Sequence, residues 1–148
     1  MLALFIAFLF ATTPAADTPE SLIKSLYARH QPGKDQNLDW CDKKAISKFA
    51  DPRLTALFIK DCQCQKRTGE ICNIDSDPFY DAQDFDSVDP NPRMKQIAPN
   101  VYEVTFTNFE DHKLIYKMTK TSAGWRISDI DSPENKWSLV KMLSTKSD

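Results

Sequence analysis

The amino-acid sequence predicts one α+β domain, in which N-terminal helices pack on a curved antiparallel meander sheet of four strands, or slightly more. Two observations support this fold class. Apolar residues recur at helical spacing in the first half of the chain, and they alternate with polar residues in the second half. Helical patterns followed by strand patterns are typical of α+β proteins. The chain of 148 residues also contains four cysteines, which predict two disulfides.

The first predicted element is a signal peptide over residues 1–16, cleaved after Ala15 or Ala16. Residues 2–10 are continuously apolar and a tract of small residues follows, which is the pattern of an export signal. The alternative is a buried strand or helix. The apolar run is shorter than the ~20 residues that span a bilayer, and no Cys follows it closely, so a lipoprotein is not expected. Residues 17–148 would form a single periplasmic or secreted domain that is not inserted in a membrane.

Three helices are predicted next, each from a start signal and an apolar stripe. Thr18-Pro19 and Asp51-Pro52 each place a capping side chain before a proline at the first helical position. The first helix should end near residues 32–33, and the third should cover 51–65. Between them, Asp39 is the predicted N-cap of a helix near 39–49.

The second half predicts four strands in a meander, over residues 93–98, 101–107, 112–120 and 124–130. Ser132-Pro133 then interrupts the pattern. A short C-terminal helix is expected from the spacing of four apolar residues, Trp137, Leu139, Val140 and Leu143. A curved sheet under helices encloses a cone, which side chains fill or which opens as a pocket.

The cysteine spacing favours disulfides over a zinc site. Zinc ligands usually occur as close pairs such as C-x2-C, whereas here a single Cys, a C-x-C pair and another single Cys occur without a nearby His. Cys41 and Cys62 both fall on stripes that should face the core. Cys64 points elsewhere on its helix and is close in sequence to Cys72. We therefore predict the pairs Cys41–Cys62 and Cys64–Cys72.

The segment 74–86, IDSDPFYDAQDFD, contains five Asp and three aromatic residues. An EF-hand loop needs an oxygen ligand at position 5 and Gly at position 6, where this segment has Phe79 and Tyr80. Asp77-Pro78 instead predicts a short helix, with Asp77 as its N-cap. We expect Phe79 to be buried and the five carboxylates not to converge, so no metal site is predicted.

The run RTGEICNIDSDPFYDAQDF resembles a signature of a bacterial family of exported domains of unknown function, domain of unknown function 3828. GWRISDI resembles the last strand of that family. The resemblance covers residues from about 20 to 145. It implies a cystatin-like α+β fold of the nuclear transport factor 2 type, and it implies no catalytic residues.

The most interesting acid in the sequence is Asp61, because it falls on the apolar face of a predicted helix. Facing an open cone, its carboxylate would be desolvated and could act as a base; the alternative is that it pairs with an Arg or caps a loop. The side chains that could line such a pocket are those on the sheet, Tyr102, Tyr116, Met118 and Trp125. His30 and His112 are isolated, and no catalytic motif, metal site or cofactor motif occurs.

These features predict an exported, non-catalytic binding domain. Its partner would be a protein or a small apolar ligand, and one version is an immunity-type inhibitor. The alternatives are a small enzyme that uses Asp61 and a purely structural envelope protein. The formal net charge is −2 with acids and bases intermixed, which argues against nucleic acid as a partner.

Overall fold

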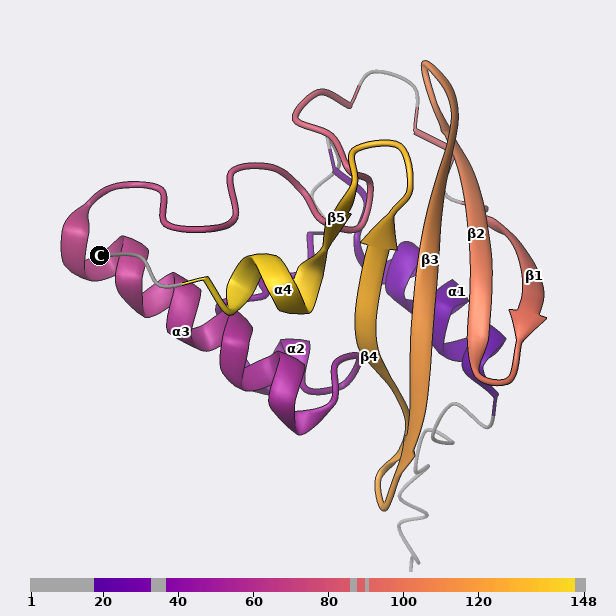
Figure 1. The fold of residues 1–148 in the computed structure, drawn as a ribbon, viewed down its shortest axis with the longest axis horizontal. Coiled ribbons are helices and arrows are strands. Elements are labelled where there is room, and N and C mark those ends of the chain that lie inside the picture. Colours follow the sequence, from indigo (N-terminus) through magenta and orange to yellow (C-terminus); the bar gives the residue numbers. More distant parts are fainter. Residues whose placement is uncertain (1–17, 33–36, 86–87, 90, 146–148) are drawn as a thin grey trace, which may run out of the picture.

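A computed structural model describes residues 18–32, 37–85, 88–89 and 91–145 (Figure 1). Three helices come first: α1 (Pro19–Arg29), α2 (Lys43–Ile46) and α3 (Pro52–Thr68). The strands β1 (Arg93–Ala98), β2 (Val101–Asn108), β3 (Glu110–Thr121), β4 (Gly124–Ser132) and β5 (Trp137–Ser138) follow, and α4 (Leu139–Leu143) ends the described chain. The strands form one sheet in the order β1-β2-β3-β4-β5, with antiparallel neighbours throughout. The α+β prediction is confirmed, with one strand more than the four identified. The predicted signal peptide lies outside the described residues.

The helix starts at Thr18 and Asp51 are confirmed in detail. The Thr18 hydroxyl accepts a hydrogen bond from the Ser21 N–H group at 3.1 Å, and Asp51 Oδ1 accepts one from the Leu54 N–H group at 2.7 Å. Each side chain thus satisfies a backbone donor that the first helical turn leaves free. At its other end α3 stops at Gly69, whose φ of 74° is in the left-handed region that suits glycine.

The middle helix is shorter than predicted. α2 begins after Asp42, not Asp39. Asp39 Oδ1 accepts a hydrogen bond from the Cys41 N–H group at 2.9 Å, two residues further on. This contact forms an Asx turn, which competes with helix formation at that point. The prediction of a helix over 39–49 is therefore wrong at both ends.

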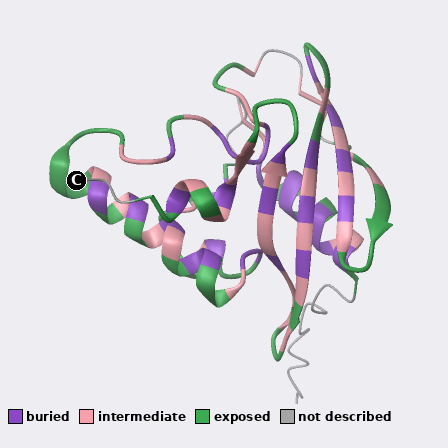
Figure 2. Cartoon of the chain, viewed as in Figure 1, coloured by how far each residue is buried: buried purple, intermediate pink, exposed green. Residues whose placement is uncertain are grey.

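The core lies between α1 and one face of the sheet. Along β2 and β3, buried and half-buried residues alternate (Figure 2), so one face of the sheet is packed and the other is partly open to water. The buried side of α1 consists of Pro19, Leu22, Ile23, Leu26 and Tyr27. The Tyr27 ring lies 6.0 Å from that of Phe106 on β2 and 6.4 Å from that of Tyr116 on β3.

Backbone hydrogen bonds connect the helical half of the chain to the sheet. The Ile127 N–H group on β4 donates to the Phe49 carbonyl at 2.7 Å, and the Ile127 carbonyl accepts from the Asp51 N–H group at 2.9 Å. The two bonds form a parallel bridge beside the start of α3. The position of α3 relative to β4 is therefore fixed by main-chain contacts as well as by side-chain packing.

The helix predicted after Asp77-Pro78 is wrong. Residues 77–82 form a closed loop, in which the Asp77 N–H group donates to the Ala82 carbonyl at 3.0 Å and the Ala82 N–H group donates back at 3.4 Å. Asp81 has a φ of 51°, in the left-handed region that cannot continue a helix. The buried position predicted for Phe79 is confirmed, because only 1% of this residue is exposed.

The C-terminal helix is present but begins later than predicted. Trp137 belongs to β5, which pairs with the end of β4, and α4 starts only at Leu139 with Ser138 as its N-cap. Among the described residues, no helix is both long enough and apolar enough to cross a membrane.

Candidate functional site

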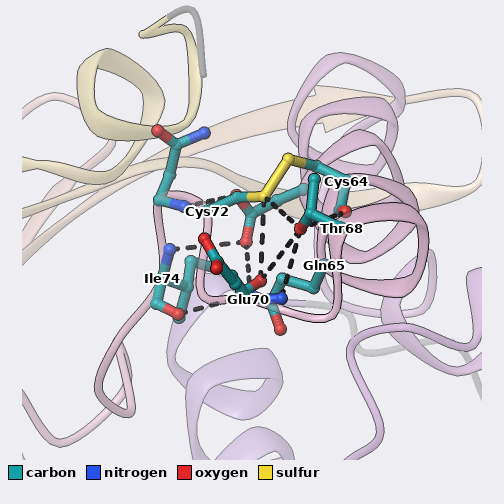
Figure 3. Close-up of a disulfide and its surroundings, with 8 residues drawn as sticks. Cys64, Gln65, Thr68, Glu70, Cys72 and Ile74 are labelled. Carbon is teal, nitrogen blue, oxygen red and sulfur yellow. Dashed lines mark hydrogen bonds between the residues drawn. A yellow bond between two sulfur atoms is a disulfide. The ribbon is translucent and has the colours of Figure 1, made fainter. Parts of the chain in front are cut away.

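Both predicted disulfides are confirmed. Cys41 is bonded to Cys62, with their Cα atoms 5.6 Å apart, and Cys64 to Cys72, with their Cα atoms 6.2 Å apart. The stripes used to predict this pairing are only partly correct, because Cys41 is exposed and Cys62 is half-buried, while Cys64 is buried. Both bonds leave α3 within one turn, and Figure 3 shows the second beside Thr68 at the C-terminal end of the helix.

Asp61 holds the loop that follows the second disulfide. Its Oδ1 accepts a hydrogen bond from the Asn73 N–H group at 2.8 Å, and its Oδ2 accepts from the Ile74 N–H group at 3.3 Å and from Gln65 Nε2 at 3.0 Å. Gln65 also donates to the Ile74 carbonyl at 3.3 Å (Figure 3). Only 2% of Asp61 is exposed, and it lines neither of the two larger pockets. Both oxygens of this carboxylate are thus engaged by the protein itself.

The sheet residues considered as pocket lining do not line the two larger pockets either. Tyr102 and Tyr116 are direct partners across β2 and β3, and both are buried, as is Met118. The Tyr116 hydroxyl lies 3.0 Å from that of Tyr27 on α1. Trp125 is on β4, where the Lys120 ammonium group lies 5.2 Å from its ring centroid. Between α1 and the strands β2 and β3, the aromatic side chains Tyr27, Phe106 and Tyr116 pack against one another.

A pocket of about 950 Å³ opens elsewhere, where the C-terminal end of α1, the segment 37–41, the end of α3 and the loop 74–85 meet. We call it the acidic pocket. Its lining consists of His30, Pro32, Asn37, Leu38, Asp39, Trp40, Cys41, Gln65, Ile74, Asp75, Ser76, Asp77, Ala82, Gln83 and Phe85. The Cys41–Cys62 bond connects the 37–41 segment to α3, so one wall of the pocket is covalently held.

A buried histidine–aspartate pair lines the acidic pocket. His30 follows the last residue of α1, and its Nε2 contacts Asp77 Oδ2. Its Nδ1 accepts a hydrogen bond from the Leu38 N–H group at 3.1 Å, so this pattern of hydrogen bonds places the proton on Nε2. Asp77 Oδ1 accepts from the Phe79 N–H group at 2.9 Å. His30 is 3% exposed and Asp77 is 8% exposed.

Three aromatic side chains surround the His30 ring. The His30 ring lies 5.4 Å from Phe79, 5.8 Å from Tyr80 and 5.9 Å from Trp40. The Tyr80 hydroxyl donates to the His30 carbonyl at 3.0 Å, and the Tyr27 hydroxyl donates to the Phe79 carbonyl at 2.8 Å. Burial raises the pKa of the Tyr80 and Tyr27 hydroxyls well above the usual value. Both phenols therefore stay protonated and remain donors over the physiological pH range.

The hydrogen bonds of this network limit what the pair can do in catalysis. Both ring nitrogens of His30 and both carboxylate oxygens of Asp77 have partners inside the protein. A general base needs a lone pair that faces the substrate, and this geometry leaves none free on the ring. The pair therefore acts as a support that joins α1 to the 74–85 loop and shapes the pocket wall.

The lining of the acidic pocket combines apolar surface with negative charge. Leu38, Trp40, Ile74 and Phe85 supply large apolar side chains. Besides the paired Asp77, two further acids line the pocket, Asp39 and Asp75, and no Lys or Arg does so among the described residues. Electrostatic complementarity then favours an apolar group that carries a positive charge or hydrogen-bond donors.

Asp81 has a different role from Asp77, although both belong to the acidic stretch. Its Oδ1 accepts from Trp137 Nε1 at 2.8 Å, and its Oδ2 accepts from Asn135 Nδ2 at 2.8 Å and from the Ser132 hydroxyl. Asp77 and Asp81 thus face different partners, while Asp86 lies outside the described residues. Within the described ranges, no group of three or more His, Cys, Asp or Glu side chains is arranged to hold a metal ion.

Comparison with known proteins returns no match: the chain matches no protein-family model, no curated protein and no solved structure. The class that fold and site define is a disulfide-linked α+β domain with one large, acidic, partly apolar pocket. Its function is therefore argued from the geometry of that pocket.

Proposed function

We propose that this protein is an exported, non-catalytic binding domain, and that its acidic pocket takes an apolar group that carries a positive charge. The observation that carries the proposal is the composition of the pocket. A volume of about 950 Å³ is lined by aromatic and aliphatic side chains together with Asp39 and Asp75, without a compensating Lys or Arg among the described residues. Pockets of this size bind small molecules or the anchoring side chain of a protein partner.

A binding role fits the pocket better than catalysis does. The His30–Asp77 pair has the residue types of an acid–base dyad, but every nitrogen and oxygen of the two side chains has a partner within the protein. Asp61, the acid on which the enzyme alternative rests, is engaged by two loop N–H groups and Gln65. Side chains held this firmly give a rigid wall, which reduces the entropic cost of binding.

Export is supported by the disulfides and by the N-terminal sequence. Two disulfides are typical of proteins that fold in an oxidising compartment. Residues 1–16 have the pattern of a cleavable signal peptide, so we place the mature domain, 17–148, in the periplasm or outside the cell. The natural ligand would be a basic side chain of a partner protein or a small organic cation.

Three phenylalkyl probes that differ in their terminal group test this proposal. 4-Phenylbutylamine, 4-phenylbutanol and 4-phenylbutyrate would be titrated into the oxidised domain, 17–148, with amide chemical shifts as the readout. We expect the amine to shift the signals of residues 37–41 and 74–77 and to bind more tightly than the alcohol, while the carboxylate binds most weakly. Equal binding of the amine and the carboxylate, or shifts confined to other regions, would contradict the proposal.

The matched variants are Asp75→Asn and Glu110→Gln. Asp75 lines the acidic pocket and is exposed, and its carboxylate makes no hydrogen bond to another residue that the structure describes, so its replacement should remove one charge with little effect on the fold. Glu110 is an exposed acid at the start of β3 and is not part of this pocket. Asp75→Asn should weaken binding of the amine about two- to fivefold, as expected for one exposed charge pair, and Glu110→Gln should leave it unchanged.

A further inference from the structure

A second pocket, of about 620 Å³, lies between α2, the N-terminal half of α3 and the β3–β4 hairpin. We call it the basic groove. It is lined by Lys43, Ser47, Ala50, Pro52, Thr55, Ala56, Ile59, Lys60, Gln63, Thr121, Ser122, Ala123 and Arg126. Gln63 of α3 lines this groove and Gln65 lines the acidic pocket. Side chains two residues apart on a helix are separated by about 200° around its axis, so the two cavities lie on different sides of α3. A ligand of the basic groove is therefore independent of the function proposed for the acidic pocket.

The charge of the basic groove is opposite to that of the acidic pocket. Lys43, Lys60 and Arg126 line it, and none of the Asp and Glu residues in the described ranges does so. None of the three cations makes an ion pair within the part of the chain that the structure describes. The acids next to the groove in sequence, Asp42 and Asp51, each accept a hydrogen bond from a backbone N–H group as a helix N-cap. In a chain with a formal net charge of −2, this cluster is a local positive patch.

Arg126 is fixed in place before any ligand binds. Its Nε donates to the Ser47 carbonyl at 2.9 Å, and its Nη1 donates to the Trp125 carbonyl at 2.7 Å. The residue is half-buried, and its Nη2 donates to no group among the described residues. A guanidinium group that is already oriented, with donors left over, suits an oxyanion such as a carboxylate. Ordering this side chain on binding would then cost little entropy.

Apolar side chains line part of the rest of the groove, next to the polar side chains of Ser47, Thr55, Gln63, Thr121 and Ser122. Ala50, Pro52, Ala56 and Ile59 come from the end of the α2–α3 connection and from the first two turns of α3, and Ala123 comes from the hairpin. None of these side chains carries a polar group. The volume of the groove is within the range of small-ligand pockets, roughly 300–1,000 Å³. An ion alone would leave this apolar surface without a partner.

We propose that the basic groove binds an aliphatic monocarboxylate, a fatty-acid-like molecule whose carboxylate accepts hydrogen bonds from Arg126. Lys60 and Lys43 add to the positive potential around the head group, and the alkyl chain covers the apolar side chains at the start of α3. Neither a bond nor a proton needs to change, so the activity is reversible binding. No sequence motif predicts this site, because its three cationic residues come from three separate elements, α2, α3 and β4.

The test uses octanoate as the probe, with octanol as the uncharged analogue, octylammonium as the opposite charge, and a peptide of alternating Glu and Gly as an acidic peptide. Each is titrated into the oxidised domain while amide chemical shifts are recorded. Octanoate should shift the signals of residues 55–60 and 121–126, with an affinity that falls as salt is added. Octanol should bind at least about threefold more weakly, octylammonium should leave these signals unchanged, and the acidic peptide should not compete.

Three variants decide whether the groove is responsible. Lys60→Gln, at an exposed position, should weaken octanoate binding about two- to fivefold. Arg126→Gln should weaken it about tenfold or more, because a hydrogen-bonded charge is lost. Lys95→Gln, on the exposed edge strand β1, is the matched control and should have no effect. If Arg126→Gln disturbs the fold, Lys60→Gln still tests the site. Failure of octanoate to bind, equal binding of octanol, an equal effect of Lys95→Gln, or binding of the acidic peptide alone would each overturn the proposal.

Discussion

At the scale of single residues, the contact between His30 and Asp77 should control stability strongly. In Asp77→Asn, one amide oxygen and one NH2 group replace the two carboxylate oxygens. The NH2 group must then face either the His30 Nε2–H or the Phe79 N–H group, and two donors cannot bond to each other. A donor left unsatisfied in a buried site costs about 1–3 kcal/mol, so we expect the free energy of unfolding to fall by about 2 kcal/mol.

Urea denaturation at pH 7 measures this loss, and Asp75→Asn is the control. Asp75 belongs to the same loop but is exposed. Its replacement should change the free energy of unfolding by no more than about 0.5 kcal/mol, as is usual at such positions. Equal stability of the two variants would show that the His30–Asp77 contact does not stabilise the fold.

The hydroxyl groups of Tyr27 and Tyr116 allow a second comparison. Tyr27→Phe removes the donor to the Phe79 carbonyl and also the partner of the Tyr116 hydroxyl. Tyr116→Phe leaves the bond from Tyr27 to Phe79 in place. We expect a loss of about 2 kcal/mol for the first variant and about 1 kcal/mol for the second, because buried groups without partners dominate the cost. Thermal and urea unfolding of both variants measure the two losses. A larger loss of unfolding free energy in Tyr116→Phe than in Tyr27→Phe would contradict this prediction.

The buried tyrosines also predict how stability depends on pH. Burial raises the pKa of Tyr27, Tyr80 and Tyr116 in the folded protein, whereas in the unfolded chain these groups titrate near pH 10. For an acid whose folded pKa is raised, the stabilisation is complete below the unfolded pKa and is lost as the pH rises towards the folded pKa. The free energy of unfolding should therefore decrease above about pH 10, by up to about 1.4 kcal/mol per pH unit for each tyrosine.

Urea denaturation at pH 9, 10 and 11 would measure this slope, and Tyr27→Phe should reduce it by one tyrosine's share. The folded protein should also show little phenolate absorbance at 295 nm until it unfolds. Strong phenolate absorbance from the folded state at pH 10 would contradict the assignment of these side chains to the core.

At the scale of elements, the two disulfides should affect different parts of the molecule. In the chain-entropy model, removing the bond Cys41–Cys62, with a separation of 21 residues, costs about 3 kcal/mol, and removing Cys64–Cys72, with a separation of 8, costs about 2.5 kcal/mol. Local effects should differ more clearly. The Asn73 and Ile74 N–H groups bond to Asp61 close to the second disulfide.

Hydrogen exchange of the double-alanine variants tests this difference. Replacing Cys64 and Cys72 should speed up exchange at Asn73 and Ile74, because the loop that presents these N–H groups to Asp61 is no longer tied to α3. Replacing Cys41 and Cys62 should instead speed up exchange at Leu38, in the segment that the first disulfide holds. The same exchange pattern in both variants would mean that the disulfides act only through global stability.

The elements show which local signals in the sequence were sufficient. Thr18-Pro19 and Asp51-Pro52 predicted helix starts correctly because capping depends on residues three or four positions away. The same signal failed at Asp77-Pro78, where the chain closes on itself between Asp77 and Ala82. The apolar spacing predicts that Trp137 belongs to the C-terminal helix, but its indole N–H group donates to Asp81, 56 residues away. That contact holds Trp137 beside the acidic stretch, and no local pattern predicts it.

The candidate site was harder to predict than the fold for the same reason. The sequence predicts Asp77 as a helix cap and His30 as an isolated histidine, but the two residues are 47 positions apart. Nothing in the spacing of either residue shows that they meet. The disulfide pairs could be predicted because they join the segment before α3, or the loop after it, to α3 itself.

At the scale of the whole molecule, the proposed export can be tested directly. In bacteria that express the full chain, we expect protein from the periplasmic fraction or the medium to begin at Ala16 or Asp17 and to have no free thiols. Deletion of residues 2–10 should leave the protein in the cytoplasm, because the apolar run of the signal is lost, and its cysteines should then react with a thiol reagent.

Mass spectrometry of the intact protein measures both properties at once. A variant with Ile71→Ser, at an exposed apolar position outside the signal, is the control and should be exported normally. Recovery of the full-length chain with an uncleaved N-terminus and oxidised cysteines in the cytoplasm would contradict export.

The two disulfides have a further consequence for the durability of the chain, since both are attached to α3 within one turn. Lys66 and Arg67 are exposed and lie between Cys64 and Cys72, and Lys43, Lys44 and Lys48 are exposed between Cys41 and Cys62. A trypsin-like protease that cuts at any one of these sites produces a nicked molecule whose two parts stay covalently joined. Outside the cell, where such proteases occur, a single cut in this region would leave the domain in one piece until a reductant separates it.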